Sequence, residues 1–132
     1  MVENIDCLFN LYIEYGNEDY IGENVSQIEH ALQCANSAGK EGYPIRVILA
    51  AFLHDIGHLL GLKLNKPQMK TSGIVYGVKD HEKLGADYLR SLGVSETICF
   101  LVENHVFGKR YLVYKVKQKE IIWRIFKKLL QI

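Results

Sequence analysis

The sequence has almost no net charge, little proline and no pattern of paired cysteines. Sixteen lysines and arginines stand against 15 acidic residues, so a basic field for binding nucleic acid is not supported. The 2 prolines and 11 glycines leave little room for a low-complexity linker. Cys7, Cys34 and Cys99 include no CxxC pair, so we expect reduced thiols in a cytoplasmic protein. The remaining composition, 48% apolar and 23% charged over 132 residues, is that of one folded domain.

Long apolar runs are also missing. The longest, residues 47–53, is far shorter than the ~18 residues that span a bilayer. The N-terminus carries acidic residues before any apolar stretch, unlike a secretory signal. We therefore expect a cytoplasmic location, with neither a membrane nor nucleic acid as a partner.

The net charge of +1 conceals two oppositely charged parts of the chain. Residues 115–132 contain six basic residues and one acid, Glu120, whereas residues 1–114 have a net charge of −4. We expect residues 1–114 to form the domain core and residues 115–132 to form a basic helix. That helix is expected to pack its apolar stripe on the domain rather than bind a membrane or nucleic acid.

Apolar residues recur at helical spacing along nearly the whole chain, and alternating strand patterns are almost absent. This pattern predicts an all-α helical bundle, with helices over about 5–15, 23–38, 44–60, 81–91 and from 95 onward. The helix over 44–60 is apolar on nearly every side, so we place it at the centre. Residues 61–79 are polar and glycine-rich and are predicted to form a long loop. The stripes expected to be buried in the first two helices are Ile5, Leu8, Phe9, Tyr12 and Ile13, and Val25, Ile28, Leu32 and Ala35.

Four of the five histidines fall on four different predicted helices. They are His30, His54, His81 and His105, and Asp55 follows His54 on the most apolar helix. Imidazole nitrogens together with carboxylate oxygens suit zinc, iron and manganese, and two metals about 3.5–4 Å apart can act on one substrate. A buried aspartate also needs a counter-charge, which a metal would supply. The joint pattern predicts a metal site between the central helices.

Several of these residues have simpler interpretations when taken alone. A single histidine on an apolar stripe, such as His105, is typically a hydrogen-bonded core residue, and Asp55 could pair with a lysine or cap a helix. His58 could face the metal site and its substrate, or could be an exposed residue at a helix end.

Three further features have ordinary physical roles. Lys109 and Arg110 could complement the dipole at a helix C-terminus, and Glu23 could do so at an N-terminus. Tyr20 could be a half-buried loop residue with a hydrated hydroxyl group.

The spacing of His30, His54-Asp55, His81 and His105 resembles that of the HD-domain superfamily, most of whose members are metal-dependent phosphohydrolases. Residues 19–35, 49–59, 81–93 and 103–113 are more specifically similar to a smaller branch, the mixed-valent diiron phosphonate oxygenases. These enzymes cleave 2-amino-1-hydroxyethylphosphonate to glycine and phosphate. The most specific segments are DYIGE and HVFGKRYLV, at residues 19–23 and 105–113.

The resemblance implies a role for each residue that carries it. Asp55 would bridge an Fe2+/Fe3+ pair, with His30 and His54 on the first iron and His81 and His105 on the second. Tyr20 and Glu23 would form a lid over the open iron, His58 would face the substrate, and Lys109 would contact the phosphonate. The implied reaction is oxidative cleavage of the C–P bond of a 2-amino-1-hydroxyalkylphosphonate by O2. Another divalent metal is the alternative cofactor.

One ligand of the resembling family has no counterpart in this sequence. The family's first iron is also held by an aspartate well downstream of the fourth histidine, but no aspartate follows Asp87 here, and Glu120 is the only acid after His105. Three explanations would account for the missing aspartate. The residues after about 114 could come from a shifted reading frame after a truncating change, or they could form a natural short helix in which Glu120 or water replaces the aspartate. The missing ligand could also come from another chain. We expect a chain shortened before its last metal ligand, with a weakened first iron and reduced turnover.

Three functions therefore compete. The lid and Lys109 favour a phosphonate oxygenase over a metal-dependent phosphohydrolase, the runner-up, while the missing aspartate favours a non-catalytic, truncated remnant.

Overall fold

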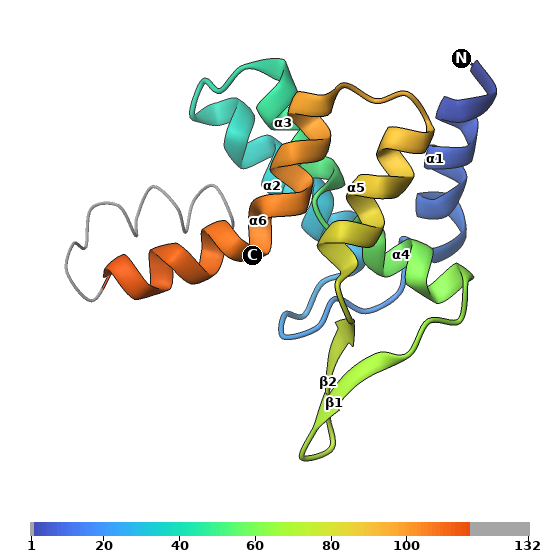
Figure 1. Ribbon diagram of the computed structural model, residues 1–132, viewed down its shortest axis with the longest axis vertical. Helices are drawn as coiled ribbons and strands as arrows, with labels where there is room; N and C mark the ends of the chain where they lie inside the picture. Colours follow the sequence, from blue (N-terminus) through green and yellow to red (C-terminus); the bar gives the residue numbers. More distant parts are fainter. Residues whose placement is uncertain (1, 117–132) are drawn as a thin grey trace.

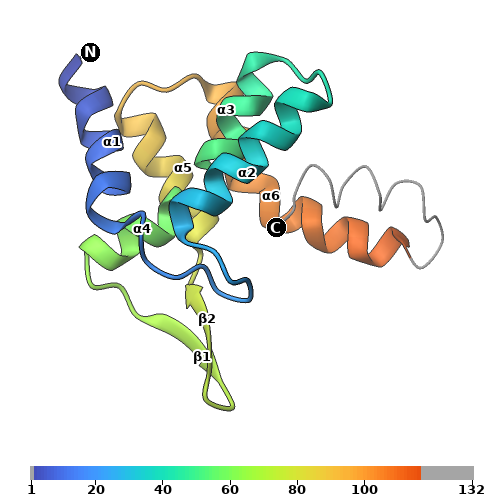
Figure 2. The same ribbon diagram turned by 180° about the vertical axis from the view of Figure 1, so that it is seen from behind.

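The computed structural model describes residues 2–116, and these residues form a helical bundle with one small hairpin. The predicted all-α fold class is confirmed. Figures 1 and 2 show the helices gathered around a common core, with the hairpin projecting from one end. The elements are α1 (Val2–Tyr15), α2 (Gln27–Lys40), α3 (Ile45–Leu53), α4 (Ile56–Lys63), β1 (Gln68–Thr71), β2 (Ile74–Val78), α5 (His81–Ser91) and α6 (Glu96–Val116).

Helix α1 ends as predicted, immediately before Gly16, but a different face of it is buried. Leu11 and Tyr12 lie in the core, whereas Ile5, Phe9 and Ile13 are exposed. The Tyr12 hydroxyl group donates a hydrogen bond to the Phe52 carbonyl oxygen at 3.1 Å, which ties α1 to the centre of the bundle. The predicted stripe was wrong at three of its five positions because α1 packs on the core through Leu8, Leu11, Tyr12 and Tyr15.

Helix α2 begins four residues later than predicted, because Ser26 and Glu29 form a capping box. The Ser26 hydroxyl group accepts from the Glu29 amide, and the Glu29 carboxylate accepts from the Ser26 amide. The buried face is also not the predicted one. Gln27, His30, Ala31, Cys34 and Ala38 are buried, while Leu32 is exposed.

The single central helix predicted over 44–60 is two helices. Helix α3 ends at Leu53 and α4 starts at Ile56, with a turn at His54 and Asp55. Both flanking segments are apolar, so the hydrophobic pattern contained no signal for the break. The turn places its two polar side chains at the centre of the bundle.

The predicted loop over 61–79 contains the antiparallel pair β1 and β2. Ser72 and Gly73 both have positive φ angles, 52° and 78°, as a tight hairpin turn of mirror-image type requires. The hairpin and the loop over 16–26 project from the same end of the bundle in both views (Figures 1 and 2). Tyr20 from this loop and Tyr76 from the hairpin line the same cavity as Asp55.

Helix α5 has the predicted bounds, and α6 extends the predicted fifth helix to Val116. The C-terminal half of α6 projects away from the bundle in both views (Figures 1 and 2). The proposed basic helix over 115–132, with Glu120, falls almost entirely outside the described residues and stays a prediction.

One segment, Ile45–Lys63, would be long and apolar enough to cross a membrane by length and composition, with a mean hydropathy of 1.5. Half of its best window is buried inside the bundle, as in the core helix of a globular protein. It is also interrupted at His54 and Asp55. We assign it to the core.

Candidate metal centre

The four predicted histidine ligands and Asp55 meet at the centre of the bundle, although they come from four separate parts of the chain. One lies on α2, two in the turn between α3 and α4, one is the first residue of α5, and one lies on α6; they are His30, His54, Asp55, His81 and His105. All except His81 are at least nine-tenths buried. The structure therefore brings together every residue that the sequence pattern predicted as a metal ligand.

The two oxygens of Asp55 face two different pairs of histidines. Oδ2 lies 2.8 Å from His54 Nε2 and 3.6 Å from His30 Nε2. Oδ1 lies 3.1 Å from His81 Nε2 and 3.4 Å from His105 Nε2. Within each pair the Nε2 atoms are also close, at 3.3 Å and 3.2 Å. One carboxylate is thus shared between two pairs of imidazole nitrogens, with one oxygen facing each pair.

Main-chain carbonyl groups determine which ring nitrogen of two histidines carries hydrogen. His54 Nδ1 lies 2.7 Å from the Ala51 oxygen, and His105 Nδ1 lies 2.6 Å from the Val102 oxygen. Because a carbonyl oxygen only accepts, each Nδ1 donates, and each Nε2 keeps its lone pair. That tautomer, fixed by a second partner, is the one that binds metal through Nε2.

Buried polar atoms in this cluster lack hydrogen-bond partners. Among the described residues, His30 Nδ1 and Asp55 Oδ2 are such atoms, so the short approach of Asp55 Oδ2 to His54 lacks hydrogen-bond geometry. Unsatisfied buried polar groups are costly unless another ligand completes them. Imidazole and carboxylate donors suit zinc, iron and manganese, so the residues present fit a metal centre.

The electrostatics of the cluster depend on Asp55. Burial would raise the pKa of its carboxyl group, but His54, His105 and His81 outweigh burial and hold that pKa well below its usual value. For His54, burial opposes protonation, yet the adjacent carboxylate raises its pKa. Burial, followed by the charge of His54, lowers the pKa of His30 to about 4. Asp55 is therefore an anion, and His30 a neutral imidazole, near neutral pH.

His58 differs from the other four histidines in its hydrogen bonding. Its Nδ1 accepts a hydrogen bond from the Val78 amide at 3.1 Å, so its hydrogen lies on Nε2. Burial, followed by the charge of His81, lowers the pKa of His58 to about 4, so the ring is neutral near pH 7. Its ring stacks on that of His81, with centroids 3.8 Å apart, and its Nε2 lies 3.8 Å from Asp55 Oδ1. His58 therefore presents a donor, not a lone pair, beside the cluster.

A cavity of about 250 Å³ opens on the cluster and includes most of the other predicted residues. Tyr20, His58 and Lys109 line it. The Tyr20 ring stacks on His30, with centroids 3.8 Å apart, and burial followed by the charge of Asp55 raises the pKa of its hydroxyl group. Glu23 is two-fifths exposed, with its carboxylate 3.9 Å from His30 Nδ1. Among the described residues that line this cavity, Asp55 is the only carboxylate.

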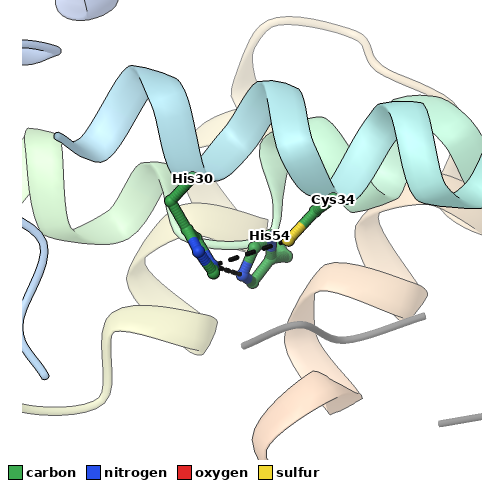
Figure 3. Close-up of side chains that lie close together, drawn as sticks. All are labelled: His30, Cys34 and His54. Carbon is green, nitrogen blue, oxygen red and sulfur yellow. Dashed lines mark hydrogen bonds between the residues drawn. The ribbon is translucent and has the colours of Figure 1, made fainter. Parts of the chain in front are cut away.

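Several residues at the site were not predicted from the sequence, and Tyr76 and Cys34 are two of them. Tyr76 lines the cavity from β2, and no sequence signal pointed to the hairpin that carries it. The Cys34 Sγ atom lies 3.5 Å from His30 Nε2. Figure 3 shows these two side chains pointing toward each other. The spacing of Cys34, four residues from His30, was a usable signal, because such residues share one face of a helix. Burial, followed by the charge of Asp55, raises the pKa of its thiol to about 12.

Comparison with known proteins adds family information. Residues 27–125 match the HD domain. The chain is 40% identical over 121 residues to an uncharacterised protein of Acanthamoeba polyphaga mimivirus. The aligned region covers 92% of this chain and 53% of that protein.

Two further relatives carry functional names. The [1-hydroxy-2-(trimethylamino)ethyl]phosphonate dioxygenase (glycine-betaine-forming) of Leisingera caerulea is 35% identical over 108 residues, covering 82% of this chain and 52% of that enzyme. The hydroxymethylphosphonate dioxygenase of Gimesia maris is 37% identical over 113 residues, covering 83% of this chain and 52% of that enzyme. The chain spans about half the length of the curated relatives that it matches.

Proposed function

This chain belongs to the HD-domain family, and we propose that it is an oxygenase with a dinuclear iron centre that cleaves the C–P bond of a small 1-hydroxyalkylphosphonate using O2. The first candidate substrate is 2-amino-1-hydroxyethylphosphonate. Two relatives named as dioxygenases of 1-hydroxyphosphonates support the substrate class.

The observation that carries the proposal is the division of Asp55 between two histidine pairs. Oδ2 approaches His30 and His54, and Oδ1 approaches His81 and His105, all at 2.8–3.6 Å. A carboxylate in this arrangement could bridge two metals, and two metals held close together can act on one substrate. When bound, the two irons would supply Lewis acidity and the electron transfers that activation of O2 needs.

The described residues that line the cavity include a lysine that suits an anionic substrate. This residue is Lys109, whose ammonium group can pair with a phosphonate oxygen. His58 can donate from Nε2 to a second oxygen, because its Nδ1 is occupied by the Val78 amide. Both groups orient the phosphonate so that its carbon faces the histidine and carboxylate cluster.

Tyr20 restricts solvent access to one half of the centre. Its ring covers His30 by stacking, and its loop is held by hydrogen bonds from the Tyr20 amide to Val25 and from the Gln27 amide to Glu18. Excluding water protects reactive oxygen chemistry from side reactions. This loop, with Glu23 beside His30, is the part of the site that can open for a substrate.

The proposed reaction balances without an external reductant. The substrate loses its C–P bond, the carbon that carried phosphorus becomes a carboxylate, and phosphorus leaves as phosphate. Glycine and phosphate together contain every atom of 2-amino-1-hydroxyethylphosphonate and of one O2 molecule. Dioxygen is the oxidant, and the carbon bearing the hydroxyl group is oxidised.

Oxygen uptake with this substrate, using protein reconstituted with iron and ascorbate, tests the proposal. Uptake that matches the glycine and phosphate released supports it. Phosphate released from phosphate monoesters without oxygen uptake would instead establish the phosphohydrolase alternative. A folded, iron-loaded protein that is silent in both assays would point to a non-catalytic domain.

A further inference from the structure

Helix α2 places a thiol beside one of the imidazoles of the histidine cluster. Cys34 lies one turn after His30 on the buried face of α2, and its side chain is 1% exposed. Its Sγ lies 3.5 Å from His30 Nε2, which lies 3.3 Å from His54 Nε2. Figure 3 shows the three side chains converging on one point between α2 and the start of the α3–α4 turn.

These separations match the edges of a tetrahedral metal site. With metal–nitrogen bonds of about 2.0–2.1 Å and a metal–sulfur bond of about 2.3 Å, tetrahedral angles separate two nitrogens by about 3.3 Å and nitrogen from sulfur by about 3.6 Å. The observed values are 3.3 Å and 3.5 Å. The Cys34, His30 and His54 donor atoms all lie within 4.8 Å of one another.

A second observation points to a ligand at the same place. Asp55 Oδ2 is buried without a hydrogen-bond partner and faces His30 and His54 at 3.6 Å and 2.8 Å. A cation held by the two histidines would satisfy this oxygen. The other half of the centre, with His81 and His105, has no sulfur among the described donor groups.

We propose that Cys34 is a ligand of the metal held by His30 and His54. The inference rests on the proposed metal centre and makes its two positions chemically unequal. One position takes two imidazoles, a thiolate and the Asp55 bridge, whereas the other takes two imidazoles and that bridge. Binding converts the thiol to a thiolate, and the released proton passes to solvent.

The thiolate has a consequence for metal preference. Sulfur donors favour zinc, cobalt and iron over the hard ions magnesium and calcium, which prefer oxygen. The negative charge of the thiolate also offsets part of the charge of a cation at the His30–His54 position. Among the described residues, Asp55 is the only carboxylate proposed as a ligand there. The His30–His54 position should therefore retain a borderline divalent metal firmly.

Cobalt(II) is a suitable probe because a Co–S bond gives an intense near-ultraviolet charge-transfer absorption that nitrogen and oxygen ligands do not give. Metal-free protein is titrated with cobalt, and bound metal is counted in parallel. We expect the sulfur band to grow with one equivalent of cobalt per chain and to disappear in Cys34→Ser. Cys99→Ser is the matched control, because Cys99 is equally buried and its thiol donates to the Val94 carbonyl oxygen away from the cluster.

X-ray absorption of zinc-loaded wild-type protein gives a test that needs no variant. One sulfur scatterer at about 2.3 Å per zinc at the first equivalent supports ligation by Cys34. Cobalt binding without a sulfur band, or a zinc shell of nitrogen and oxygen alone, overturns the role of Cys34 and leaves the proposed metal centre intact. Failure to bind cobalt or zinc overturns both.

Discussion

Gly57 on α4 lies directly against the main-chain carbonyl group of His81 at the start of α5, and no β-carbon could be placed between them. This contact allows α4, which follows the bridging Asp55, to approach the helix that begins with a predicted ligand. The glycine between the two histidines of the HDIGH segment is thus a packing requirement of the site.

Replacing Gly57 by alanine should disrupt this approach. We expect Gly57→Ala to lower the free energy of unfolding by about 1–3 kcal/mol, as overpacking does, and to weaken metal binding by displacing His81. Urea denaturation and a metal titration measure the two effects. The control is Gly39→Ala on α2, whose β-carbon would meet only the Ile48 Cδ1 atom at 3.8 Å and which should be neutral or slightly stabilising. Equal stability of the two variants would contradict the packing argument.

His81 and His58 should affect different properties although their rings stack. His81→Ala removes an Nε2 that faces Asp55 Oδ1 at 3.1 Å, so we expect it to lower the metal content and abolish turnover. His58→Ala removes a donor to the substrate, so we expect full metal content with slower turnover. Metal analysis beside oxygen uptake distinguishes the two variants. Loss of metal in His58→Ala would show that His58 is a ligand after all.

Lys109 should matter for the substrate and not for the metals. Loss of a charge-assisted hydrogen bond worth about 1.5–3 kcal/mol predicts that Lys109→Ala raises KM for the phosphonate about tenfold or more. Arg110→Ala is the matched control, because consecutive helical residues project about 100° apart and Arg110 is not among the described residues that line the cavity. Steady-state kinetics on both variants measures the two KM values. An equal rise in KM for both variants would contradict a specific contact between Lys109 and the phosphonate.

Tyr20 should slow the escape of metal from the His30 side. Tyr20→Ala removes the ring that stacks on His30, so we expect faster loss of metal to a chelator. Tyr20→Phe keeps the ring and should retain the slow rate while losing any effect of the hydroxyl group. Stopped-flow mixing with a chelator measures the rate of metal loss. Identical rates in wild type and Tyr20→Ala would contradict the prediction that the Tyr20 ring slows the escape of metal.

The grouping of the histidines was predictable because they fall on four separate predicted helices, and Asp55 follows His54 on the most apolar of these. His105 lies on a predicted apolar stripe, and Asp55 beside His54 has no reason to be buried without a partner cation. What these residues share is that their side chains can bind a metal. That property can be seen in the sequence without knowing where each helix begins or ends.

Other features were not predictable because the sequence pattern was uniform or too short. The break at His54 and Asp55 lies between two apolar segments, and a continuous helix has the same hydrophobic pattern. The hairpin strands are four and five residues long and mostly exposed, so period-two alternation could not show them. In α1, tertiary packing selected Leu11 over Ile13, although both belong to an amphipathic helix.

The central claim is that Asp55 bridges two metals, one on each pair of histidines. Anomalous diffraction at the iron edge, from crystals of iron-loaded protein, tests it most directly. We predict two iron peaks about 3.5–4 Å apart, one beside His30 and His54 and one beside His81 and His105, each contacting one Asp55 oxygen. A single iron shared by all four histidines, or no iron at this cluster, would contradict the account.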